Sequence, residues 1–446
     1  MCHLVLKKIL VLAHHLVPYT PSYGQIARHL TLINQLAESY EVHVVTVKGN
    51  KDYGNFGFEY SKKVKFYFSK DINYFPEEVS RPISGTTKAS KALYVVKNYG
   101  FLYLVSLINK KIKSMLLIDR YEFSAVGNFY KKTSTVIKKN NFSIILVMTP
   151  PFSMYKLAYL IKKNFNHIPI ILDIQDSWVV PALLKNKSIL AKRSKKIEKR
   201  SIDIVDGVAF NIPIMKKKYD EFYNITHKSE LFMNGFDYEY HKKNKINNNT
   251  KLKLNDKKLN IGYFGKIHIG NDEYFRDIRK FFNFFKKVDK NFKDKIHLDI
   301  YGHFSGNYKK WYDFVPFSYR GKLNFNDVSN HMNQYDALMI FHSDKSRAEE
   351  VLTGKIFEYL YARKPVIVLG PENMIEARNL IEKNNLGIYV NIDDESHMKN
   401  QLNHLFKLKY NNLLVSSFNQ EFELSSYSRK KINLEYLDWI NKHTIT

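Results

Sequence analysis

The sequence predicts an α/β protein made of two Rossmann-like domains. Short apolar runs of β-strand length alternate with segments of helical periodicity. This alternation occurs twice, once on each side of a polar stretch near residue 245. Alternating β and α elements favour a parallel sheet covered by helices, so we expect two such sheets.

The N-terminal half contains several candidate strands and an amphipathic helix. The helix is expected over residues 25–39, where Ile26, Leu30, Ile33 and Leu36 fall on one face. The strands are expected over residues 8–14, 41–47, 64–68, 143–148, 169–174 and 207–210.

The C-terminal half repeats this pattern. Its strands are expected over residues 259–264, 296–301, 337–341, 365–369 and 387–390. Residues 241–258 are polar, rich in Asn and Lys and without apolar periodicity, as is typical of an exposed connector. We therefore expect an N-terminal domain over residues 1–244 and a C-terminal domain over residues 245–425, followed by a helix within residues 426–446.

The composition is that of a globular protein. Of 446 residues, 44 % are hydrophobic and 25 % are charged, which excludes disordered and collagen-like chains. The single cysteine, Cys2, excludes a disulfide scaffold and a Cys-based zinc site. No apolar run reaches the roughly 18 residues of a membrane span, and the run at residues 9–13 is too short for a signal peptide. We therefore expect a cytoplasmic protein.

Positive charge is in excess, with 70 Lys and Arg against 43 Asp and Glu and a net charge of +27. This balance favours anionic partners, but an AT-rich coding bias produces it as well. Residues 185–200 hold eight basic residues and the single acid Glu198, and residues 98–113 combine an apolar face with lysines. Either segment could rest on an anionic membrane surface or be a solvated helix face, and the sequence leaves both open.

The most informative segment is EVLTGKIFEYLYARKP, residues 350–365. A helix is expected to begin near Lys355, after a turn at Thr353 and Gly354. Its N-terminal N–H groups, the bare backbone of Gly354 and the charge of Lys355 suit a diphosphate. Glu350 before the turn and Glu358 inside the helix can accept hydrogen bonds from hydroxyls on either side. A nucleotide sugar has this layout of ribose, diphosphate and sugar.

This segment resembles the family 4 glycosyltransferases, which are retaining enzymes of the GT-B fold, and in particular their bacterial surface-glycan branch. The family's E-x7-E motif and the residues that follow it are matched by Glu350, Glu358, Tyr359, Lys364 and Pro365. Further landmarks occur in the family's order: residues 18–28 (PYTPSYGQIAR), 148–152 (MTPPF), 172–178 (LDIQDSW), 206–207 (DG), 234–237 (NGFD) and 262–266 (GYFGK).

The resemblance implies a GT-B fold in which two Rossmann-like domains face each other across a cleft. The C-terminal domain would bind the nucleotide sugar, the N-terminal domain the acceptor, and the last helix would cross back to the first domain. Family members need no metal and no cofactor besides the donor substrate. The sequence agrees with this expectation, since no DxD pattern stands at a plausible strand end.

The resemblance also implies roles for residues of the C-terminal domain. Glu358 would hold the ribose hydroxyls, and Glu350 would act at the sugar beside the reacting carbon. The diphosphate would be bound by Gly265, Lys266, Thr353, Gly354 and Lys355. Many members have an arginine where Lys266 stands and a second cation where residues 270–271 stand, so that second cation is Lys355 or is absent.

In the N-terminal domain the resemblance implies that Gly24 allows close approach to the donor. Many members carry a catalytic His at the end of the strand that matches residues 169–174. This chain has no His there, so Asp173 or Asp176 would take the catalytic place, or no residue would.

The function that this implies is transfer of a sugar from a nucleotide-diphosphate donor, with retention, to a hydroxyl acceptor. We expect the acceptor to be a glycan or a polyprenyl- or lipid-linked molecule of polysaccharide or lipopolysaccharide synthesis, at the inner face of the cell membrane. Two alternatives stay open. One is a nucleotide-sugar epimerase or hydrolase of the same fold. The other is a non-catalytic basic protein that binds nucleic acid or membrane, although no nucleic-acid-binding motif is present.

Overall fold

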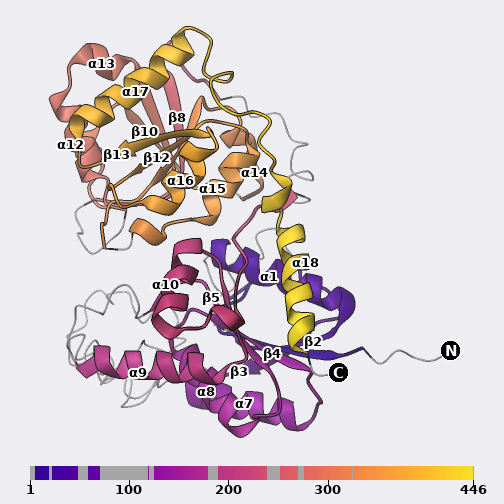
Figure 1. Cartoon of the computed structure of the whole chain (residues 1–446). Helices are drawn as coiled ribbons and strands as arrows, with labels where there is room; N and C mark the ends of the chain where they lie inside the picture. The colour runs from indigo at the N-terminus through magenta and orange to yellow at the C-terminus, as the bar shows by residue number, and fades with distance from the viewer. Residues whose placement is uncertain are drawn as a thin grey trace, which may run out of the picture. The chain divides into compact units, whose positions relative to one another are not determined.

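The computed structural model describes residues 6–19, 23–48, 59–70, 119, 125–178, 189–238, 252–269, 276–323, 325–346 and 348–444. The chain divides into two compact units (Figure 1). The N-terminal unit holds residues 1–233 and 433–446, and the C-terminal unit holds residues 234–432. The expected boundary at residues 244 and 245, and the basic segment 98–113, lie outside the described residues.

The N-terminal unit is built on a parallel sheet, which has seven strands in the part that the structure describes, in the order β3-β2-β1-β4-β5-β6-β7. The strands are β1 (Lys8–Ala13), β2 (Glu41–Val47), β3 (Lys65–Ser69), β4 (Ile144–Thr149), β5 (Ile170–Ile174), β6 (Gly207–Phe210) and β7 (Ser229–Leu231). The six predicted strands are confirmed, and the central ones are buried along their whole length, as strands covered on both faces are. The short β7 was not predicted because only one of its three residues is apolar.

Helices cover both faces of this sheet. They are α1 (Tyr23–Ser39), α7 (Val126–Lys138), α8 (Ser153–Asn164), α9 (Ile189–Ile204), α10 (Pro213–Tyr223) and the chain's last helix, α18 (Arg429–His443). In Figure 1, α7, α8 and α9 lie on one face, and α1 and α18 on the other. Gly207 makes room for α18, because a Cβ there would lie 2.9 Å from the Trp439 ring.

The one acid of the basic segment 185–200 points into this unit rather than to solvent. Glu198 on α9 is fully buried and accepts the hydroxyls of Tyr219 (2.6 Å) and Tyr223 (2.7 Å). The Tyr219 oxygen in turn accepts the backbone N–H of Trp178, at 3.1 Å. Glu198 therefore ties α9 and α10 to the loop that follows β5, and it does not neutralise the exposed side of α9.

The C-terminal unit is built on a second parallel sheet, with six strands among the described residues, in the order β10-β9-β8-β11-β12-β13. These are β8 (Leu259–His268), β9 (Ile296–Ser305), β10 (Phe317–Gly321), β11 (Ala337–Phe341), β12 (Val366–Gly370) and β13 (Gly387–Asn391). All five predicted strands are confirmed. The strands β8 and β9 run in register four residues beyond their predicted ends. The edge strand β10 was missed because its residues are mixed in polarity and only partly buried.

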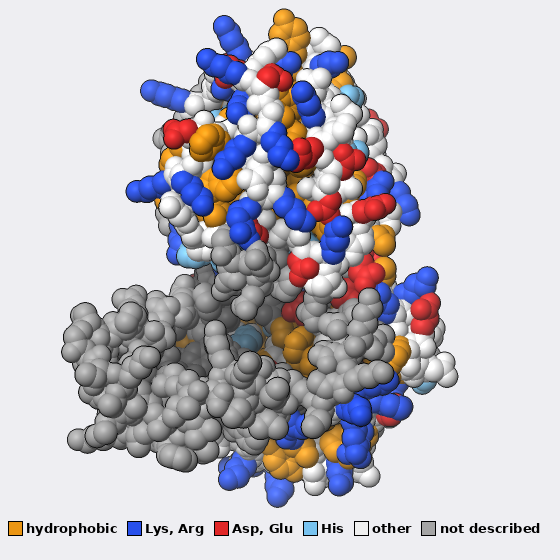
Figure 2. Space-filling view, turned by 90° about the vertical axis from the view of Figure 1, so that its left-hand side faces the viewer, with side chains coloured by type: hydrophobic (Ala, Val, Ile, Leu, Met, Phe, Trp, Pro, Cys, Tyr) orange, Lys and Arg blue, Asp and Glu red, His pale blue; other side chains and the backbone are white. Residues whose placement is uncertain are grey.

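Three helices cover one face of this sheet, with a core that is rich in Phe from α12. They are α12 (Arg279–Lys287), α13 (Lys290–Asp294) and α17 (Glu395–Tyr410). On the other face lie α14 (Phe325–Met332), α15 (Gly354–Tyr361) and α16 (Ile375–Lys383) (Figure 1). Figure 2 shows Lys and Arg side chains spread over the visible face of the C-terminal unit, with Asp and Glu between them.

Removing the Tyr219 hydroxyl should destabilise the N-terminal unit. In Tyr219→Phe the buried Glu198 loses one donor and the Trp178 N–H loses its acceptor. We expect a loss of about 1–3 kcal/mol in the free energy of unfolding, measured by urea titration. The matched control is Tyr410→Phe, because Tyr410 is 78 % exposed and should leave stability unchanged. Equal stability of the two variants would contradict the role given to the Glu198 contacts.

Candidate functional site

The N-terminus of α15 is open to a ligand. The helix begins at Gly354, one residue before the predicted start near Lys355, and Thr353 precedes it in an extended conformation without capping the helix through its side chain. A Cβ added to Gly354 would have no described atom within 4 Å. No described residue therefore covers the first residue of the helix, and a helix start with free N–H groups and a positive dipole end can bind an anion.

Lys355 lies close to other cationic side chains and to no carboxylate of the described residues. Its ammonium lies against Gly265, where a Cβ would collide with Nζ, and 5.2 Å from the centre of the Tyr263 ring. Burial lowers the pKa of Lys355 well below its ordinary value, and the positive charges of Arg276 and Lys266 lower it further. No carboxylate pairs with Nζ anywhere in the described ranges. The absence of a Cβ at Gly265 therefore leaves room for the Lys355 side chain.

More positive and titratable groups gather at the carboxyl ends of β8, β9 and β11. Burial lowers the pKa of His268, and His303, Arg276 and Lys266 add to this effect. Burial lowers the pKa of His342 to about 4, with Arg276 contributing and Asp344 opposing. Lys266 is exposed at the same edge of the sheet. This edge is where open parallel sheets bind ligands.

Arg276 is the cation that sequence reasoning missed. It follows β8 by eight residues and matches no position of the family's motif. The only signal in the sequence was its place shortly after the predicted strand 259–264 and the Gly265-Lys266 pair that follows that strand. The structure brings its charge close enough to Lys355, His268 and His342 to lower the pKa of each.

The predicted acidic pair also belongs to the C-terminal unit. Glu350 ends a short 3-10 turn, Ala348–Glu350, and is 9 % exposed. Glu358 lies one turn inside α15, is 7 % exposed, and pairs with Arg429 at 3.5 Å. Five of the predicted residues thus lie at or near the start of one helix: Glu350, Thr353, Gly354, Lys355 and Glu358. Gly265 and Lys266 join them from β8.

The predicted residues of the N-terminal unit have different surroundings. Asp173 at the end of β5 is fully buried and pairs with Arg28 at 3.3 Å. Asp176, two residues beyond the end of β5, is exposed at the carboxyl edge of the sheet. Gly24 is the second residue of α1, and the structure does not describe what surrounds it. The catalytic roles of Asp173 and Asp176 stay predictions, and the burial of Asp173 points to a structural role.

Arg28 supports that structural reading. Its guanidinium donates to the backbone carbonyls of Phe232 (2.5 Å) and Met233 (3.3 Å) as well as to Asp173. Burial lowers the pKa of the neighbouring His29 to about 4, although the Asp173 carboxylate opposes this shift. Asp173 therefore helps to anchor the segment at which the N-terminal unit ends.

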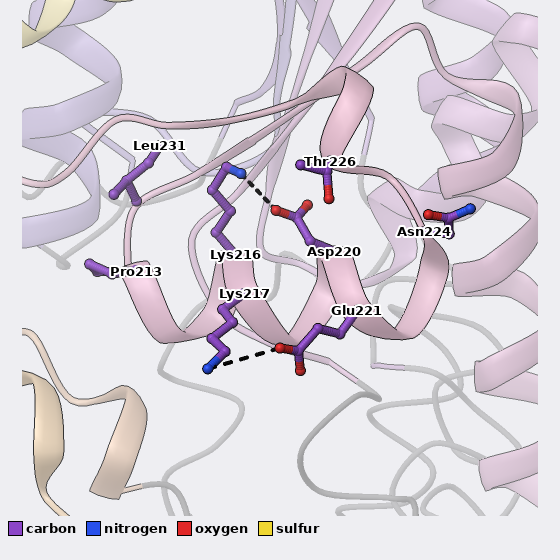
Figure 3. Close-up of a pocket in the computed structure, with 8 residues that line it drawn as sticks. All are labelled: Pro213, Lys216, Lys217, Asp220, Glu221, Asn224, Thr226 and Leu231. Atoms are coloured by element: carbon purple, nitrogen blue, oxygen red, sulfur yellow. Dashed lines mark hydrogen bonds and ion pairs between the residues drawn. The ribbon is translucent and has the colours of Figure 1, made fainter.

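A surface hollow on α10 is not the candidate site. Figure 3 shows its lining, in which lysines and acids of the same helix face one another. Lys216 pairs with Asp220 at 2.6 Å, and Lys217 with Glu221 at 3.9 Å. These charges are already balanced, in contrast to that of Lys355.

The described residues contain no group of three His, Cys, Asp or Glu side chains placed to hold a metal ion. No helix among them is both long and apolar enough to cross a membrane.

Solved structures match the chain over nearly its whole length, whereas no protein-family model and no curated protein sequence matches it. Sucrose-phosphate synthase of Thermosynechococcus elongatus matches with a TM-score of 0.64 and 11 % identity, over 98 % of each chain. Anabaena HepE in complex with UDP gives 0.58 and 10 %, over 98 % of this chain and 100 % of that one. The lipopolysaccharide outer core galactosyltransferase WaaB gives 0.56 and 11 %, over 98 % and 99 %.

These matches identify the fold. The chain has the GT-B fold, with two parallel sheets and their covering helices, and its likeness to glycosyltransferases of this fold is confirmed.

Acid should destabilise the C-terminal unit through His342. Its pKa falls from 6.5 to about 4 on folding, so the unfolded chain takes up the proton more readily. Stability is therefore full above pH 6.5 and is lost as the pH falls towards 4, by about 3 kcal/mol in total from this residue.

The measurement is the free energy of urea unfolding across this pH range. His342→Asn should flatten the dependence, whereas His167→Asn, at an exposed position, should not. An unchanged slope in His342→Asn would show that His342 does not carry this linkage.

Proposed function

We propose that the protein is a glycosyltransferase that binds a nucleotide-diphosphate sugar in its C-terminal unit and transfers the sugar to a hydroxyl acceptor. The observation that carries the proposal is Lys355 at the start of α15, which lies against Gly265 and among other cations, with no carboxylate partner in the part of the chain that the structure describes. A diphosphate supplies the missing negative charge. The GT-B neighbours support this choice, since HepE was solved with UDP and with UDP-glucose.

The chemistry of transfer fits this arrangement. As the bond from sugar to diphosphate breaks, negative charge grows on the leaving oxygen. Lys355, Lys266, Arg276 and the N–H groups of α15 are fixed donors and charges that stabilise it, so the proposed reaction needs no metal ion. Glu358 accepts hydrogen bonds from the ribose hydroxyls, and Glu350 contacts the sugar near the reacting carbon. Transfer with retention remains part of the proposal.

The proposed acceptor is a glycan on a lipid carrier at the inner face of the cell membrane, as in polysaccharide or lipopolysaccharide synthesis. Two observations support it. Two of the structural neighbours are WaaG, a glycosyltransferase involved in lipopolysaccharide biosynthesis, and WaaB, a lipopolysaccharide outer core galactosyltransferase. The exposed side of α9 has an excess of basic residues, because Glu198 is buried and the exposed acid Asp203 pairs with Lys199 alone, at 2.8 Å. Its exposed basic residues are Lys192, Lys195, Lys196, Lys199 and Arg200.

Nucleotide binding should stabilise the folded protein and should depend on Lys355. A nucleotide at about 100 times its dissociation constant adds about 2.7 kcal/mol, which raises the melting temperature. We expect such a rise with one of UDP, GDP, ADP and dTDP, and its loss in Lys355→Met. Gly265→Ala should also lose it, because the new Cβ displaces the ammonium at its flexible end.

Gly127→Ala is the matched control, since a Cβ at Gly127 has no described atom within 4 Å and lies on α7 of the other unit. It should keep the full nucleotide effect. A folded protein that no nucleotide stabilises would overturn the proposed function. Release of free sugar from the bound donor, with no transfer to any hydroxyl acceptor, would instead favour the hydrolase alternative.

Binding to acidic membranes should depend on the exposed side of α9. The triple variant Lys195→Glu, Lys196→Glu and Lys199→Glu should lose at least about 3 kcal/mol of affinity for vesicles that contain phosphatidylglycerol, measured by co-sedimentation. The variant should stay folded, because these side chains are exposed and the one ion pair it loses, Lys199–Asp203, is a surface pair.

The control reverses the same number of exposed lysines in the C-terminal unit, at Lys257, Lys290 and Lys407. It has the same net charge as the α9 variant, so it should retain most vesicle binding if the α9 surface is the contact. Equal losses in the two variants would mean that only total charge matters and that α9 is no docking surface.

A further inference from the structure

Two backbone segments that are distant in the sequence run side by side in the C-terminal unit. One is residues 234–236, and the other is residues 427–429. The Phe236 N–H donates to the Tyr427 carbonyl at 3.0 Å, and the Arg429 N–H donates to the Phe236 carbonyl at 2.9 Å. A Cβ at Gly235 would collide with the Tyr427 carbonyl, so this close pairing requires glycine. The backbone of Arg429 is thereby fixed in place.

Both segments pack on α15, the helix that carries Glu358. The Phe236 ring lies 5.2 Å from that of Tyr361, and the Tyr427 ring lies 5.3 Å from that of Phe357. The helix is therefore held on the same side by two aromatic contacts, one from each segment. Arg429 starts α18 next to these contacts.

The Arg429 guanidinium reaches the carboxylate of Glu358. The distance from Nη2 to Oε1 is 3.5 Å, and the two side chains are only 7 % and 9 % exposed. A buried carboxylate without a cation is costly, and a planar guanidinium restricts how the carboxylate can turn. We propose that Arg429 is a positioning residue that holds the Glu358 carboxylate in the orientation needed to accept ribose hydroxyls, a role that rests on the proposed function.

The proposal gives Arg429 a defined effect on specificity. An ionised carboxylate only accepts hydrogen bonds, and those from hydroxyls to a charged oxygen are the strong kind. A misaligned carboxylate loses this gain but leaves the diphosphate contacts of Lys355 intact. Loss of Arg429 should therefore remove discrimination between ribose and deoxyribose, while diphosphate binding persists.

The test compares the dissociation constants of UDP and 2′-deoxy-UDP by calorimetry. In the parent protein UDP should bind at least about tenfold more tightly, as expected for one hydrogen bond to a charged group. In Arg429→Met this ratio should fall to about one, and Arg429→Lys, which keeps the charge and secures folding, should give an intermediate ratio. Glu358→Gln should lower the ratio as well, and adding Arg429→Met to it should change nothing further.

Arg363→Met is the control for a purely structural effect. The Arg363 guanidinium donates to the carbonyls of Gln420 (2.9 Å) and Phe422 (2.8 Å), in the same C-terminal segment. This variant should keep the parent ratio even if its melting temperature falls. The positioning role is overturned if Arg429→Met or Arg429→Lys keeps the full preference for UDP over 2′-deoxy-UDP that the parent protein and Arg363→Met show. If the parent protein binds neither UDP nor GDP, the proposed function fails, and the role of Arg429 fails with it.

Discussion

The site depends on one electrostatic constraint, a lysine side chain that is held in a confined place with no carboxylate beside it among the described residues. Lys355 occupies the space that Gly265 leaves on β8, and neighbouring positive charges make its surroundings more unfavourable still. Removing a charge from water costs free energy unless an opposite charge compensates. Under the proposed function a bound diphosphate would offset this cost, because it would bring an opposite charge to Lys355.

The backbone around this constraint is organised by close approaches that only glycine permits. At Gly265 the approach is to a side chain, and at Gly302, which has a φ of +116°, it is to the backbone of Gly265 on the paired strand. At Gly235 it joins two distant segments of the chain and so brings Arg429 to Glu358. Helix α15 is thus positioned by its own sheet and also by residues 234–236 and 427–429, which belong to the same unit.

Charge in this protein has at least two different structural settings. On the C-terminal unit, lysines and acids alternate over the surface, as solvated residues do (Figure 2). On α9 the acid Glu198 is buried under Tyr219 and Tyr223, which leaves an exposed surface with a basic excess. The net charge of +27 does not distinguish these settings, because composition carries no information on which side of a helix is buried.

The sequence by itself determined the fold class, the order of the buried strands and the start of α15. Apolar runs and turn residues encode these features locally, and for strands covered on both faces the hydrophobic signal is strong. The sequence did not predict β10, because this strand lies at the edge of its sheet and its hydrophobic signal is weak. Tertiary structure alone decided that Arg276 joins Lys355, that Asp173 is buried against Arg28, and that Arg429 meets Glu358. These contacts join residues that are far apart in the chain, and no periodicity of a single segment records such a pairing.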